Sequence, residues 1–209
     1  MRSMMTVAAI VALATSAAAT AKPAMEDLEI LGVHPGDEAS SVADKLATKG
    51  FAFQPARFSL SECDSSYEAV KEQYVRDRST RILENSLSCT ENFTKDQFTS
   101  VTVTYLYAPG KRRVVSALSY RFKSTETAVA LKDRVAAKFG TPCYADAISG
   151  TYMWRTGPQC SAGEAGLKLQ ASEYHETKSL SLSTPMASVF AEELSRDVRN
   201  SLGDQPADL

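Results

Sequence analysis

The amino-acid sequence predicts an α+β fold in which antiparallel sheet is covered by helices. Residues 101–107 and 114–122 are rich in β-branched and aromatic side chains that alternate by face, which is typical of strands packed on one side. A Pro-Gly dipeptide between them predicts a hairpin turn. Residues 125–139 repeat apolar side chains at helical spacing, and Gly140 and Pro142 end this helix. We therefore expect the helix to lay one apolar face on the hairpin.

A similar unit stands nearer the N-terminus. Residues 28–33 predict a strand, and the turn that follows ends in Asp37, which is placed to cap a helix. Apolar residues at helical spacing predict this helix over 39–46, and Gly50 closes it. Residues 51–58 alternate well enough to be the next strand.

Residues 61–99 give a weaker pattern. The spacing of apolar residues predicts a short helix over 67–74 and a strand that arrives at Cys89. Three arginines in this stretch can hold an anion, but the acids between them favour a solvated face; they are Arg76, Arg78 and Arg81.

The C-terminal part of the chain predicts three more strands and a last helix. The strands are 151–155, 167–171 and 180–182, and the last two form a hairpin through 175–178. Thr184 can cap the final helix, with Pro185 at its first position and Gly203 at its end.

Residues 1–21 have the anatomy of a secretory signal peptide. Arg2 supplies the positive charge, a short apolar run follows, and small residues offer cleavage after Ala19 or Ala21. The apolar run is shorter than the roughly 20 residues that a membrane-spanning helix needs, and a buried N-terminal helix is the alternative. No cysteine follows the run, so the lipid attachment site of a bacterial lipoprotein is missing. We expect an exported protein, periplasmic or extracellular, with no integral membrane segment after cleavage.

The mature chain is expected to form two α+β subdomains, residues 22–99 and 100–203, with a flexible tail at 204–209. It is long enough to bury a substantial core. Residues 1–21 hold one of the 23 basic residues and none of the 25 acidic ones, so the mature net charge is about −3. This balance gives no electrostatic reason to expect nucleic acid or an anionic membrane as partner. We expect a protein or a small envelope ligand instead.

All four cysteines lie in the mature chain, and an even number in an oxidising compartment predicts two disulfides. Of the three possible pairings, we favour Cys63 with Cys89 and Cys143 with Cys160, because each pair brackets a local segment. Each bridge contributes roughly 3 kcal/mol in the loop-closure model. Zinc and redox sites fit less well, since no two cysteines have C-x-x-C spacing and the chain has two histidines.

No set of residues has the spacing of a catalytic or metal centre, so we predict no catalytic residue, no metal and no cofactor. The nearest cluster is Glu173, His175 and Glu176, in or beside the predicted turn of the last hairpin. Residues two apart on a strand share a face, so Glu173 and His175 can point the same way. Solubility alone also accounts for a polar hairpin tip.

Two stretches of the chain, 31–58 and 124–155, resemble each other, because each has a capped helix that ends in Gly and is followed by an aromatic strand. In the second, Phe139-Gly140-Thr141-Pro142 precedes Tyr152 and Trp154. This pattern resembles that of the small outer-membrane lipoproteins of the barrel-assembly machinery, the SmpA/OmlA type. The tandem arrangement with two local disulfides is also similar to secreted β-lactamase inhibitory proteins, which repeat such a unit around a concave sheet. The resemblance implies two related β/α units, although no lipobox cysteine is present and no inhibitor loop can be matched residue by residue.

Together these features predict an exported, non-enzymatic binding or interaction protein, acting through an exposed sheet face or loop. Aromatic side chains on the predicted strands are candidate binding residues, because aromatic residues are favoured at binding hot spots; they are Tyr105, Tyr107, Tyr120, Tyr152 and Trp154. The alternative for these rings is packing in the core or across strands. Two other functions stay open: an envelope-acting hydrolase, which can work with a pair of carboxylates, and a secreted enzyme inhibitor.

Overall fold

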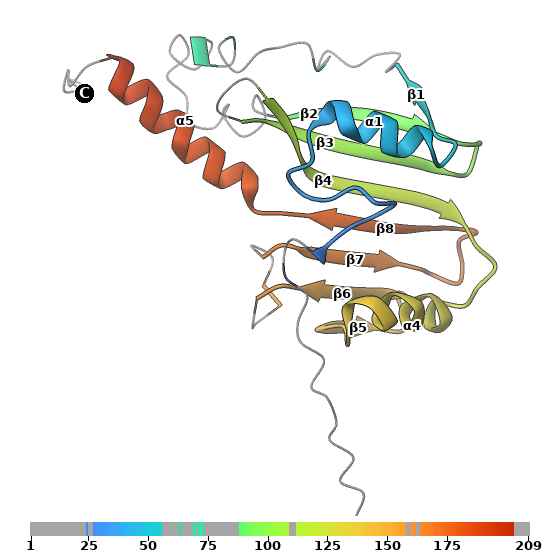
Figure 1. The fold of residues 1–209 in the computed structure, drawn as a ribbon. Helices are drawn as coiled ribbons and strands as arrows, with labels where there is room; N and C mark the ends of the chain where they lie inside the picture. The colour runs from blue at the N-terminus through green and yellow to red at the C-terminus, as the bar shows by residue number, and fades with distance from the viewer. Residues whose placement is uncertain are drawn as a thin grey trace, which may run out of the picture.

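Eight antiparallel strands form one sheet in the computed structural model, which describes residues 24, 27–55, 63, 69, 71–72, 88–108, 112–157, 160–161 and 164–202 (Figure 1). The strands are β1 (Ala52–Gln54), β2 (Ser88–Thr94), β3 (Ser100–Ala108), β4 (Arg112–Lys123), β5 (Tyr144–Asp146), β6 (Thr151–Arg155), β7 (Gly166–Gln170) and β8 (Thr177–Ser183). The helices within the described ranges are α1 (Ala39–Ala47), α4 (Ala128–Phe139) and α5 (Met186–Leu202). The order across the sheet is β1-β2-β3-β4-β8-β7-β6-β5. The predicted fold class is confirmed.

Each half of the sheet is a helix followed by a four-stranded meander. Helix α1 precedes β1 to β4, α4 precedes β5 to β8, and the pairing of β4 with β8 joins the halves. The predicted boundary between residues 99 and 100 falls in the turn between β2 and β3, which pair along the whole of β2. The two predicted subdomains therefore share one sheet, and the chain passes from the first half of the sheet to the second after β4.

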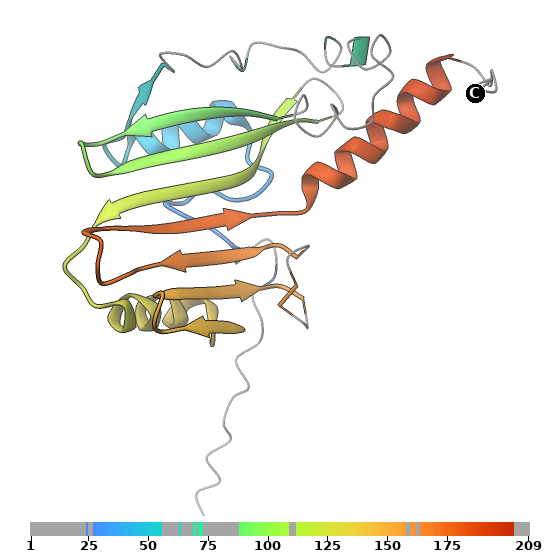
Figure 2. The same cartoon turned by 180° about the vertical axis from the view of Figure 1, so that it is seen from behind.

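One side of the sheet is covered. Helices α1 and α4 lie on this side, and residues 27–38 cross it between them (Figure 1). Figure 2 shows the opposite side, where no helix of the described residues lies in front of the middle of the sheet. At one end of β3 on that opposite side, Leu106 and Ala108 are buried, and α5 contacts β3 there. The sheet thus has a covered side and a side that is largely open.

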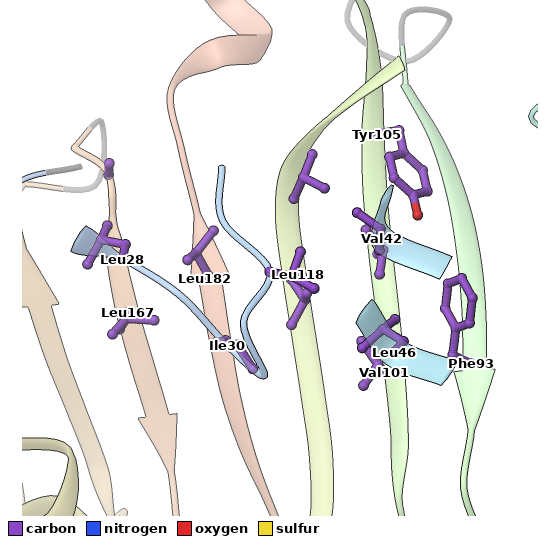
Figure 3. Packing of buried hydrophobic residues seen from close by; sticks show 14 of the residues in the cluster. Leu28, Ile30, Val42, Leu46, Phe93, Val101, Tyr105, Leu118, Leu167 and Leu182 are labelled. Atoms are coloured by element: carbon purple, nitrogen blue, oxygen red, sulfur yellow. The ribbon is translucent and has the colours of Figure 1, made fainter. Parts of the chain in front are cut away.

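The hydrophobic core fills the space between the sheet and its cover (Figure 3). From the cover come Leu28, Ile30, Val42 and Leu46, and from the strands come Phe93, Val101, Tyr105, Leu118, Leu167 and Leu182. All ten are at most 3% exposed. The strand residues alternate along the chain, which confirms the period-two pattern predicted for these strands.

The predicted strand at 28–33 is wrong. Leu28, Ile30 and Val33 are buried as expected, but the backbone turns at Leu31 and Gly32, which have φ of 57° and 81°. Glycine adopts this left-handed conformation without a steric penalty, so the turn forms where the apolar pattern alone indicated a continuous strand. The turn brings Ile30 and Val33 together in an isolated antiparallel bridge. Residues 28–33 cross over the sheet and do not form one of its strands.

Asp37 stabilises the turn before α1 and does not cap the helix. Its Oδ2 atom accepts hydrogen bonds from the backbone N–H of His34 (2.7 Å) and from Nζ of Lys45 (2.6 Å). The N-cap residue is Glu38, which makes no side-chain capping bond. The sequence places an aspartate one residue too early for the capping role.

The other helix ends combine confirmed and corrected predictions. Gly140 ends α4 with φ of 76°, as predicted. The N-cap of α4 is Thr127, whose Oγ1 accepts from the N–H of Ala130 at 3.2 Å. Helix α5 begins at Met186, so Thr184 and Pro185 both precede it, and Oγ1 of Thr184 donates to the carbonyl of Ser116 at 2.9 Å. This contact fixes the start of α5 against the β4 bulge, where Ser116 is the extra residue.

Both predicted disulfides are confirmed. Cys63 pairs with Cys89, and Cys143 pairs with Cys160, with Cα–Cα distances of 5.2 Å and 5.7 Å. These distances lie within the usual range for disulfides. Cys89 is within β2, which begins at Ser88, and residues 82–87 of the strand predicted to arrive at Cys89 lie outside the described residues.

Several predictions concern residues outside the described ranges. They are the signal peptide at 1–21, most of the helix over 67–74, the arginine cluster, the turn residues 109–111, the second half of the strand at 51–58, and the tail at 204–209. Among the described residues, no helix combines the length and the apolar character needed to cross a membrane.

Candidate binding face

The predicted aromatic binding residues lie on the covered side of the sheet. Tyr105, Tyr107, Tyr152 and Trp154 are at most 3% exposed, and Tyr120 is partly buried. Their burial contradicts a binding role on an exposed face for the first four and agrees with the packing alternative. These rings therefore belong to the core.

Two of these buried rings carry a polar group, the indole N–H of Trp154 and the hydroxyl of Tyr105. Nε1 of Trp154 donates to the carbonyl of Gly140 at 2.8 Å, which links β6 to the end of α4. Burial first, and the carboxylate of Glu91 second, raise the pKa of the Tyr105 hydroxyl, which therefore stays protonated at neutral pH. The guanidinium of Arg113 lies 5.9 Å from the centre of the same ring.

The acidic and histidine cluster is a solvated turn. Glu173, His175 and Glu176 are all exposed between β7 and β8, and none belongs to a strand. Glu176 pairs with Lys123 at 2.9 Å, and the hydrogen bond from Lys123 lowers the pKa of this carboxyl. Among the residues that the structure describes, no three His, Cys, Asp or Glu side chains gather as a metal site. The geometry therefore gives this turn no acid-base or metal-binding arrangement.

The open side of the sheet presents two long rows of mainly polar side chains, which we call the open face. Cross-strand register defines the first row as Thr94, Ser100, Arg121, Ser179, Gln170, Thr151 and Asp146. The second row is Asn92, Thr102, Ser119, Ser181, Lys168, Met153 and Tyr144. Neighbouring strands are about 4.8 Å apart, so each row extends over roughly 30 Å. The open face is a broad surface of short side chains.

Hydrogen bonds between neighbouring strands orient part of the second row. Oγ1 of Thr102 donates to Oδ1 of Asn92 at 2.8 Å. The hydroxyl oxygens of Ser119 and Ser181 are 3.3 Å apart, within hydrogen-bond distance. Since each hydroxyl can donate once and accept twice, these groups keep capacity for a ligand.

Two cations stand near the centre of the open face. Arg121 is exposed and Lys168 is half-buried, and neither has an ion-pair partner among the described residues. The acid of the two rows is Asp146, at the β5 edge, where it accepts hydrogen bonds from the Ser149 hydroxyl (2.8 Å) and from nearby backbone N–H groups. The bond from Ser149 lowers the pKa of Asp146, which is therefore ionised at neutral pH. The centre of the open face is positively charged.

Sequence reasoning predicted an exposed sheet face or loop but proposed the aromatic residues for it, and it missed the residues that form the open face, although a signal for them was present. Strand β8 alternates serines with the apolar residues Leu180 and Leu182, so that Ser179, Ser181 and Ser183 stand at every second position. Such a run marks one face of the sheet as polar, but only the register between strands shows which residues lie side by side.

Comparisons with protein-family models, with curated proteins and with solved structures find no match for this chain.

Proposed function

We propose that this chain is an exported, non-enzymatic binding protein that engages its ligand with the open face of the sheet. The observation that carries the proposal is the unequal cover of the sheet. Helices α1 and α4 and residues 27–38 lie on one side, while the other side presents two polar rows to solvent. A monomer gains little stability from such a surface, which favours a role in recognition. Periplasmic or extracellular location remains part of this proposal.

The test blocks the middle of the open face with a bulky side chain. Ser181→Phe introduces a ring between Ser119 and Lys168, whereas Ser40→Phe introduces the same ring at an exposed position of α1, on the covered side. Wild type and both variants are immobilised and exposed to envelope extract from the native host, and retained proteins and glycans are identified by mass spectrometry.

We expect a component that wild type and Ser40→Phe retain and that Ser181→Phe loses. Thermal unfolding of Ser181→Phe, compared with wild type, checks that the fold is intact. Retention that is indifferent to Ser181→Phe, or no specific retention by wild type, would contradict the proposal.

A secreted enzyme inhibitor is the second candidate. The observation that favours it is the internal repeat of a helix followed by a four-stranded meander, which agrees with the arrangement that the resemblance to β-lactamase inhibitory proteins implies. This candidate requires that the retained component be an enzyme. Its activity should fall when wild type is added and stay unchanged when Ser181→Phe is added instead. A retained component without catalytic activity rejects it.

A further inference from the structure

We propose that the ligand of the open face is an anionic polysaccharide that bears carboxylate groups. This inference rests on the proposed binding function and adds the chemical class of the ligand.

The first step is the position of the charges. Arg121 on β4 and Lys168 on β7 are separated by β8, in adjacent rows. Adjacent strands lie about 4.8 Å apart and two residues along a strand add about 6.8 Å, so the backbone positions of the two cations are roughly 12 Å apart. Asp146 lies four strands from Arg121, and Lys123, two residues after Arg121 on β4, is already paired with Glu176. The centre therefore attracts anions, although the whole chain has a net charge of −2.

The second step is the chemistry between the charges. Ser179, Ser181 and Ser119 present hydroxyl groups, and Gln170 presents an amide, so each can both donate and accept hydrogen bonds. A sugar chain is a polymer of hydroxyl groups with the same double capacity. The spacing of two cations within a field of neutral polar groups fits a chain whose carboxylates are separated by uncharged sugar positions.

The third step is the order of the side chains along the second row. From β4 to β5 it runs through Ser119, Ser181, Lys168, Met153 and Tyr144. Tyr144, at the edge, is 46% exposed. A tyrosine ring with an apolar body and a polar hydroxyl suits the C–H face of a sugar ring. The row thus has an aromatic end, a cation and hydroxyl groups in a line across five strands.

The same features disfavour an acidic protein surface as the ligand. Protein interfaces depend on aromatic or arginine anchors that fill desolvated pockets, and serine and threonine are under-represented among such anchors. Seven of the fourteen residues in the two rows have short hydroxyl side chains, Arg121 is exposed and so is not in a desolvated pocket, and Tyr144 lies at the β5 edge. We therefore choose the glycan and make an acidic peptide an outcome of the test.

The experiment measures binding by isothermal titration calorimetry with three probes: polygalacturonate, neutral dextran and poly-L-glutamate. The variant R121Q/K168Q removes both central cations. The control K132Q/R134Q removes two cations from α4, on the covered side, and so produces the same net charge. Y144A removes the ring at the edge of the row.

We expect wild type and K132Q/R134Q to bind polygalacturonate with similar affinity. R121Q/K168Q should bind at least about ten-fold more weakly, since a hydrogen bond to a charged group contributes at least that factor. Y144A should bind several-fold more weakly, and dextran should not bind measurably. Added salt should weaken binding, because the two cations are on an accessible surface.

Four results would overturn the inference: no binding of polygalacturonate, equal binding of dextran, equal weakening by the control variant, or binding of poly-L-glutamate that is as tight and as dependent on Arg121 and Lys168. If polygalacturonate fails while retention of an envelope component still depends on Ser181, the glycan is wrong and the binding function stands. If retention is also indifferent to Ser181→Phe, both proposals fail.

Discussion

The same strands form both sides of the sheet, but one side is apolar and buried, and the other is mainly polar and largely open to solvent. On β8, Leu180 and Leu182 lie against the covered core, while the alternating residues Ser179 and Ser181 belong to the open face. The covered side buries apolar area and so stabilises the fold. The open side keeps polar groups in water, where they contribute little to stability. Alternation along each strand therefore places the residues that stabilise the fold on one side and the proposed ligand-binding residues on the other. Substitutions on the covered side should lower stability, and substitutions on the open side should lower ligand binding.

The largest expected loss of stability follows Trp154→Ala. Trp154 is 1% exposed, and its indole N–H bonds to the carbonyl of Gly140. Removal of a buried indole typically costs about 3–5 kcal/mol in the free energy of unfolding. Urea unfolding of the purified protein, followed by circular dichroism, measures the loss.

Trp154→Phe separates packing from the hydrogen bond at this site. It keeps most of the apolar ring volume but leaves the Gly140 carbonyl without the indole donor. We expect a loss smaller than that of Trp154→Ala. Equal losses would mean that the hydrogen bond, and not packing, dominates here.

Adjacent residues of β8 give the most direct test of the two sides. Leu182→Ala should lower the free energy of unfolding by about 2–5 kcal/mol, since Leu182 is 1% exposed in the core. Ser181→Ala, one residue away on the open face, should change it by no more than about 0.5 kcal/mol. Among variants that remain folded, Ser181→Ala should reduce ligand retention more than Leu182→Ala does. Comparable stability losses at both positions would disprove the division between the sides.

The disulfides allow the two halves of the sheet to be compared. Cys143→Ser with Cys160→Ser opens a bridge with a sequence separation of 17, next to β5 and β6. We expect a loss of roughly 3 kcal/mol in the free energy of unfolding. The pair Cys63→Ser with Cys89→Ser, in the other half, has a separation of 26 and should lose slightly more in the same model. Urea unfolding of the two double variants measures both losses.

The sequence predicted the elements well where one local signal was sufficient. Alternation and the tryptophan identified β6, and the Gly140 stop identified the end of α4. It failed where a local signal had two solutions: the buried run at 28–33 became a turn because Gly32 permits positive φ. It also missed β5, because three residues are too few to show a period.

The open face was beyond sequence reasoning for a different reason. Arg121 and Ser179 are neighbours only because β4 pairs with β8, and these strands are far apart in the chain. Periodicity shows which side a residue faces but does not show its neighbour across strands. The sequence also left two interpretations open for the aromatic residues, a binding face or the core. Tyr152 and Trp154 are buried, and the indole N–H of Trp154 bonds to the carbonyl of Gly140 at the end of α4.

The smallest expected effect concerns the polar edge of the covered side, where Glu29 connects the crossing segment to α4. One carboxylate oxygen pairs with Nζ of Lys138, and the other lies 3.1 Å from Nε2 of His34. The hydrogen bond from Lys138 is the main cause that lowers the pKa of Glu29 from its usual value of 4.5. A carboxyl with a lowered pKa stabilises the folded state above its unfolded pKa, and this contribution disappears as the pH falls through the folded pKa.

Glu29→Gln should therefore lower the free energy of unfolding at pH 7 by less than about 1 kcal/mol, since the pair is partly exposed and screened by solvent. The difference between wild type and variant should shrink as the pH falls below 4.5, because wild-type Glu29 then loses the charge that the variant already lacks. Urea unfolding at a series of pH values measures this difference. A difference that stays constant across the series would assign the contribution of Glu29 to packing and neutral hydrogen bonds instead of to its charge.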